Sequence, residues 1–116
     1  MMLSDVIPMS LRSVAIPLSD LGVDDVAWRA ADALQVIDYL RGTSVAIAGG
    51  DLYRVEPWGI APMADDWRCD SWRGEMATSY ADRSRKIAVA FIRDSQERLG
   101  DSVLYLLLFS MQQDAA

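Results

Sequence analysis

The stretch Ser44–Gly59, SVAIAGGDLYRVEPWG, has an apolar run on each side of Gly49-Gly50. Two adjacent glycines can supply both of the positive-φ positions that a two-residue primed turn requires. After the glycines, Tyr53 and Val55 alternate with charged residues, which is the period of a strand. This stretch therefore predicts a β-hairpin over residues 44–56 that turns at Gly49-Gly50.

The Gly49-Gly50-Asp51 sequence also resembles parts of two chemical motifs. A phosphate-binding loop needs glycines that open a helix, whereas these open a strand-like segment. A Gly-Gly-Asp hairpin also occurs at the metal site of nucleotide cyclases, but Leu52 stands where a second metal carboxylate would be needed. Both interpretations are disfavoured against a simple turn, in which Asp51 either accepts hydrogen bonds from turn amides or points at a partner.

Two segments have the apolar spacing of amphipathic helices. The first covers residues 24–41, with Asp24 or Asp25 as its cap, an Asp25/Arg29 ion pair, and Gly42 at its end. The second covers residues 75–98. Both segments are expected to pack one apolar face on the hairpin.

The remaining strands are predicted from apolar runs. Residues 103–109 are apolar on both faces, as in a central strand. A short third strand around residues 60–67 would lie at an edge, because Pro62 cannot donate to a ladder. We expect one domain over residues 1–116, with an irregular lead-in over 1–22 and a core over 23–110. The predicted fold class is α+β, with two layers: a small antiparallel or mixed sheet, made of the hairpin and the C-terminal strand, and two helices packed on one face.

Composition excludes several classes of function. The chain has 116 residues, a net charge of −6 and no histidine, so Ser-His and Cys-His catalytic sites are excluded. The acidic balance argues against binding nucleic acid or an anionic membrane. We expect no cofactor and no metal. The single Cys69 suits a reducing cytoplasm, and the longest strongly apolar run, at 103–109, is far shorter than the roughly 20 residues of a membrane span.

Tryptophan and aspartate are concentrated between Pro57 and Gly74, a segment predicted to be the least regular of the chain. Aromatic anchors ringed by charge are typical of protein interfaces, while large aromatics also close the open end of a core. Trp28 and Trp67 are expected in the core. For the rest of the segment both interpretations stay open, and the candidate partner-binding residues are Asp51, Trp58, Asp65, Asp66, Asp70 and Trp72.

Several short motifs together resemble the immunity protein 40 family of bacterial polymorphic toxin systems. They are AIAGGDLY, Asp65-Asp66-Trp67 with the following Arg68-Cys69, and the helix with Tyr80, Ser84 and Phe91-Ile92. Asp66 stands where the family pattern has asparagine, and Trp58 and Trp72 lie outside the pattern. The positions that match the family pattern are Gly49, Gly50, Tyr53, Trp67, Tyr80 and Ser84, which we take as structural, and Asp51 and Asp65, which remain candidates for partner binding.

The resemblance implies a cytoplasmic antidote that binds a cognate toxin domain and inhibits it stoichiometrically, without enzymatic activity. A basic surface on that toxin would suit the acidic loop. Two alternatives stay open: a small adaptor or secretion-chaperone-like module, and, more remotely, an enzyme that holds a metal on Asp51 and Asp66.

Overall fold

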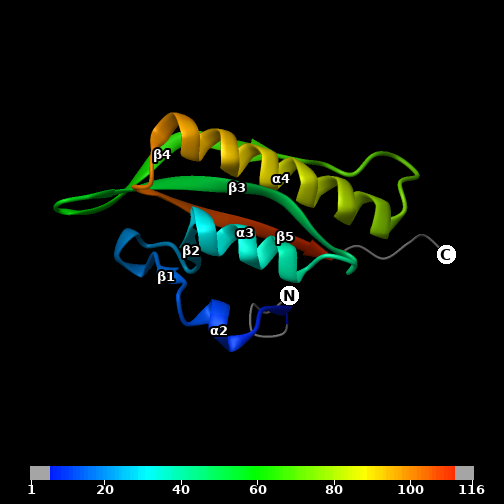
Figure 1. Cartoon of the computed structure of the whole chain (residues 1–116), viewed down its shortest axis with the longest axis horizontal. Coiled ribbons are helices and arrows are strands. Elements are labelled where there is room, and N and C mark those ends of the chain that lie inside the picture. Colours follow the sequence, from blue (N-terminus) through cyan, green and yellow to red (C-terminus); the bar gives the residue numbers. More distant parts are fainter. Residues whose placement is uncertain (1–5, 112–116) are drawn as a thin grey trace.

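A computed structural model describes residues 6–111, in which the labelled elements are five strands, three α-helices and one short 3-10 helix (Figure 1). In chain order these elements are α2 Met9–Arg12, β1 Ile16–Pro17, the 3-10 helix η1 Ser19–Leu21, β2 Val26–Arg29, α3 Ala30–Tyr39, β3 Val45–Glu56, β4 Gly59–Arg68, α4 Ala77–Leu99 and β5 Val103–Met111.

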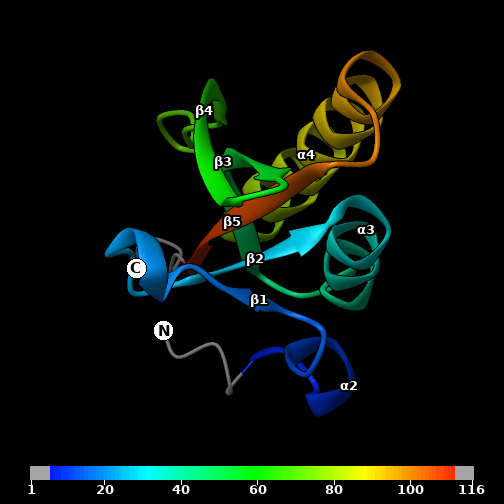
Figure 2. The same cartoon turned by 90° about the vertical axis from the view of Figure 1, so that its left-hand side faces the viewer.

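The five strands form one antiparallel sheet in the order β1-β2-β5-β3-β4, with β5 at its centre and β4 at one edge. Helices α3 and α4 lie side by side on the same face of this sheet (Figure 2). The predicted α+β class and its two helices on one face are therefore confirmed. The prediction of a buried C-terminal strand next to the hairpin is also confirmed, since β5 pairs with β3 along most of its length.

The predicted turn at Gly49-Gly50 is wrong. Both glycines lie inside β3, and the chain reverses instead at Pro57-Trp58, between the paired residues Glu56 and Gly59. Gly50 has no positive φ. Its lack of a side chain serves close packing, because a Cβ there would overlap the indole of Trp67 and lie 2.7 Å from the carbonyl oxygen of Leu106. Asp51 lies within β3 as well, so the expected hydrogen bonds from turn amides to its side chain do not form.

The predicted start of the first helix is also wrong. Residues Val26–Arg29 form β2, and α3 begins at Ala30 with no side-chain cap. The side chain of Asp25 accepts a hydrogen bond from the backbone N–H of Val26 instead of capping a helix. A strand suits this segment because Ala27 and Trp28 are both buried, on opposite faces of the sheet. The proposed Asp25/Arg29 pair is absent from the ion pairs of residues 6–111.

The other element predictions hold within a few residues. Helix α4 and strand β5 match the predicted ranges, and β4 is an edge strand that contains Pro62. Most of the segment predicted to be irregular is therefore regular strand. The predicted lead-in over 1–22 includes α2, β1 and η1, while its residues 1–5 lie outside the described part of the chain.

The two faces of the sheet carry separate apolar clusters. The face under the helices holds the larger one, which includes Trp28, Trp67 and Tyr105. The opposite face holds Tyr53 and Leu104 around Leu18 of the N-terminal segment. One side of the sheet is thus sealed by helices, and the other is only partly covered.

Tyr80 and Ser84 face the sheet from successive turns of α4, as their spacing predicts. The Tyr80 hydroxyl donates a 2.6 Å hydrogen bond to the carbonyl oxygen of Cys69. The Ser84 hydroxyl accepts one of 2.9 Å from the backbone N–H of Ile47 and donates to the carbonyl oxygen of Ala81. These bonds join α4 to β3 and to the end of β4.

Replacing Ser84 with alanine should lower the free energy of unfolding by about 1–3 kcal/mol, because the buried N–H of Ile47 loses its acceptor. Chemical denaturation measures this difference. Ser79→Ala is the matched control, since Ser79 is exposed on the same helix and its replacement should change stability by less than about 0.5 kcal/mol. Equal effects of the two substitutions would contradict the role given to Ser84.

Candidate functional site

The two exposed tryptophans lie at opposite ends of β4. Trp58 occupies the β3–β4 turn and Trp72 the loop between β4 and α4, with 75% and 66% of their surfaces exposed. These two segments are at the two ends of the long axis of the molecule (Figure 1). A ten-residue strand is about 30 Å long, so the predicted binding segment divides into two separate places.

At the turn, Trp58 borders a hollow of about 330 Å³ next to η1. The hollow is also lined by Leu18, Leu21 and Ile60, and Asp20 is the one acidic side chain among the described residues that line it. None of the predicted aspartates lies here. Trp58 is therefore apart from the carboxylates with which the sequence grouped it.

The aspartates of β4 are divided between the two faces of the sheet. Asp65 lies on the helix side with Trp67, and its charge contributes to raising the pKa of Arg98 on α4, after the larger effect of Asp94. Asp66 follows it in the strand and so faces the opposite, open side. There it lies directly across from Asp51 of β3.

Arg68 neutralises part of the charge of the two facing carboxylates. Its Nη2 atom is 3.1 Å from Asp51 Oδ1 and 3.7 Å from Asp66 Oδ2. Its Nη1 atom donates to the carbonyl oxygens of Gly50 and Trp67. A guanidinium thus supplies the positive charge that a metal ion would supply in the metal-site alternative. Among residues 6–111 no group of three or more metal-binding side chains comes together.

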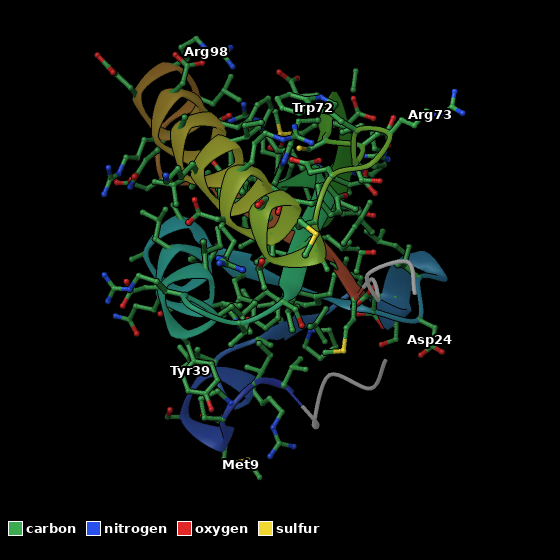
Figure 3. The ribbon with its side chains drawn as sticks, turned by 90° about the vertical axis from the view of Figure 1, so that its right-hand side faces the viewer. Met9, Asp24, Tyr39, Trp72, Arg73 and Arg98 are labelled. Atoms are coloured by element: carbon green, nitrogen blue, oxygen red, sulfur yellow. The ribbon has the colours of Figure 1, made fainter. Side chains whose placement is uncertain are left out.

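Trp72 is held in place by Arg83 of α4. The Arg83 guanidinium carbon lies 3.9 Å from the centre of the indole ring, a cation–π arrangement. The same guanidinium pairs with Glu75 at 2.7 Å and donates to the carbonyl oxygen of Asp70 and to Cys69 Sγ. The Glu75 carboxylate also accepts from the backbone N–H of Trp72. Figure 3 shows Trp72 and Arg73 in this loop, with Arg73 pointing outward.

The Glu75–Arg83 ion pair next to Trp72 strongly favours the ionised form of Glu75. The side chain of Glu75 is only 7% exposed. The hydrogen bond from Arg83 lowers the pKa of Glu75 from 4.5 to about 2, against the opposing effect of burial. The pKa of Arg83 is raised by the same contact. The ionised Glu75 carboxylate therefore stabilises the β4–α4 loop through Arg83 and the backbone N–H of Trp72.

Acid should release this loop. Because the pKa of Glu75 is lower in the folded chain than in the unfolded one, its carboxylate stabilises the loop fully above about pH 4.5, and that stabilisation is lost as the pH falls toward about 2. The indole N–H signal of Trp72, followed by NMR during an acid titration, should shift in this window. Glu75→Gln should show the released signal already at neutral pH. An identical titration in the variant would assign the transition to another group.

Four of the residues taken as structural have buried side chains: Tyr53, Trp67, Tyr80 and Ser84. Tyr53 is buried on the open face, and burial, with smaller contributions from Asp51 and Asp25, raises its pKa. Trp67 stacks on Phe91 of α4 with ring centres 4.7 Å apart.

Comparison with known proteins gives one match, and it covers most of the chain. The model of a family described as Immunity protein 40 matches residues 17–109, from the end of β1 into β5. The chain belongs to the immunity protein 40 family. A search of curated proteins and a search of solved structures gave no significant match. As the family name implies an immunity protein, an inhibitory role is favoured over an enzymatic one.

The immunity protein 40 match covers both ends of β4 and therefore does not by itself choose between Trp58 and Trp72. Geometry distinguishes them, because only Trp72 is fixed by an ion pair and lies at the same end of β4 as Asp51 and Asp66.

Arg68, Arg83 and Glu75, which organise this end, were not predicted as site residues. Glu75 and Arg83 are eight residues apart, which in the helix predicted over residues 75–98 would be about 12 Å and too far for an ion pair; the pair forms because Glu75 lies in the loop before α4. No helix within residues 6–111 is long and apolar enough to cross a membrane.

Proposed function

We propose that this chain is a cytoplasmic antidote that binds a cognate bacterial toxin domain and neutralises it in a one-to-one complex. The family match carries this proposal. An exposed, immobilised tryptophan supports it, because an anchor that is already ordered loses little entropy on binding.

The proposed contact surface is called the Trp72 surface and consists of Asp51, Asp66, Asp70 and Trp72. Asp66 and Trp72 are six residues apart, so they lie within about 20 Å. Exposed carboxylates beside an aromatic anchor suit a partner with a basic surface and an apolar pocket. We leave Asp65 and Trp58 out of this proposed surface, because Asp65 faces the helix side of the sheet and Trp58 lies at the other end of β4.

The direct test is co-expression with the toxin domain encoded beside this gene. The proposal expects a stable one-to-one complex and loss of the toxin's activity at equimolar antidote. A complex that leaves the toxin fully active would instead favour the adaptor or secretion-chaperone alternative. Failure to bind that domain at all would remove the proposal.

The carboxylates should act mainly on the association rate. Changing Asp51, Asp66 and Asp70 together to asparagine should slow association about 3- to 10-fold at low salt, with a smaller effect at high salt, since exposed charges are screened. Stopped-flow or surface-based kinetics at two ionic strengths measure this. Asp65→Asn is the matched control for Asp66→Asn, because these neighbours face opposite sides of the sheet. Equal slowing by both single changes would mean that only net charge matters.

A further inference from the structure

A second feature lies in the helix layer, on the opposite side of the sheet from Asp51 and Asp66. Helices α3 and α4 border a groove of about 440 Å³. Figures 2 and 3 show the two helices next to each other along this layer. Apolar side chains of both helices, Leu34, Ile37 and Val89 among them, line the groove.

Arg85 is the unusual member of this lining. It is only 6% exposed, and its Nη1 atom donates to the carbonyl oxygens of Thr43 at 3.1 Å and Val45 at 2.8 Å. No carboxylate within residues 6–111 lies at ion-pair distance from it, and its other N–H groups make no hydrogen bond there. None of those nitrogens is fully enclosed, and Arg85 is among the residues that line the groove.

A buried guanidinium without a counter-ion is costly. Burial lowers the pKa of Arg85, which reports the same cost, while the charge of Asp82 opposes this only in part. An anion that enters the groove would offset it. The geometry of Arg85 therefore favours a negatively charged group in the groove.

The rim of the groove strengthens this preference. Arg41 and Lys86 are paired with Asp38 at 3.1 Å and with Asp82 at 3.0 Å. Arg93 also lines the groove and has no ion pair within the described residues. Together with Arg85 it leaves two uncompensated positive charges, on a chain whose net charge is −6. The local charge is thus opposite to that of the molecule.

We propose that the groove between α3 and α4 docks an acidic segment of a partner protein, with apolar side chains on the floor and carboxylates at Arg85 and Arg93. Complementary charge and an apolar floor between two helices are the features by which grooves take up amphipathic segments. The groove lies in the helix layer, whereas Asp51 and Asp66 lie on the open face of the sheet. A segment in the groove therefore leaves Asp51 and Asp66 accessible, and this inference goes beyond the proposed function.

The test uses the full chain and a fluorescein-labelled amphipathic peptide with a leucine stripe flanked by glutamates. Binding is followed by fluorescence anisotropy, and methyl NMR signals of Leu34 and Val89 locate it. The expected result is saturable binding that weakens at least tenfold in the Lys86→Glu/Arg93→Glu variant. Arg73→Glu, an exposed arginine on the β4–α4 loop (Figure 3), is the matched control and should change affinity less than twofold.

Three outcomes would overturn the proposal. The first is equal binding of a peptide with lysines in place of the glutamates, which would show a purely apolar contact. The second is unchanged binding by the charge-reversed variant, or methyl shifts located outside the groove. The third is a response of the groove signals to inorganic phosphate but not to the glutamate peptide, which would indicate a small-anion site. Toxin binding is measured on the same variants. Loss of peptide binding with unchanged toxin binding, or the reverse, then shows which of the two proposals fails.

Discussion

Replacing Gly50 with valine should lower the free energy of unfolding by about 3 kcal/mol or more, enough to unfold a marginally stable chain of this size. A Cβ at this position would overlap the Trp67 ring and approach the Leu106 carbonyl oxygen to 2.7 Å. The ring is itself stacked on Phe91, and the carbonyl belongs to the central strand. Neither neighbour has room to move aside.

Two further variants separate crowding from backbone strain. Gly42 has φ +81° with nothing near its virtual Cβ, so Gly42→Ala should cost only about 1 kcal/mol, from its left-handed backbone alone. A Gly50→Ala/Trp67→Leu double variant should lose less unfolding free energy than the sum of the losses in Gly50→Ala and Trp67→Leu, because the smaller side chain makes room for the added Cβ. Denaturant titrations supply all of these values. If Gly50→Val were no worse than Gly42→Ala, close packing would not explain the glycine.

The wrong prediction of a turn at Gly49-Gly50 shows that local sequence does not contain the contacts made with distant residues. Two glycines fit both a primed turn and a strand crossed by a large ring, and only the position of Trp67 on the neighbouring strand distinguishes the two. The error over residues 24–29 is of the same kind. The apolar residues there fit a helical stripe, but pairing of Trp28 with Tyr105 on the central strand overrides it.

Predictions for longer, strongly patterned segments needed no such distant information. The periodicity of α4 and the continuous apolar run of β5 were sufficient, and Pro62 placed β4 at an edge. The candidate site lies between these cases. Its aspartates and tryptophans were visible as residues, but the face of Asp65 depends on strand parity, and the ordering of Trp72 depends on Arg83 across the loop.

The largest functional effect is expected from Trp72. If it is the anchor of the proposed toxin complex, Trp72→Ala should accelerate dissociation about 30- to 1,000-fold, which corresponds to about 2–4 kcal/mol. The fold should survive, because Arg83 keeps its contacts with Glu75, with the Asp70 carbonyl oxygen and with Cys69. If the variant remains folded, faster dissociation can be attributed to the lost contact between Trp72 and the partner.

Trp58→Ala is the matched control for this measurement, because it removes the same side chain, at similar exposure, from the other end of β4. Its dissociation rate should stay within about twofold of the parent. The effect of Trp72→Ala should persist at high salt, since loss of apolar contact is not screened, unlike the effect of the aspartate changes. A larger effect of Trp58 than of Trp72 would move the interface to the β3–β4 turn and the neighbouring hollow at η1. Parent-like dissociation in both folded variants would place the toxin contact on neither end of β4.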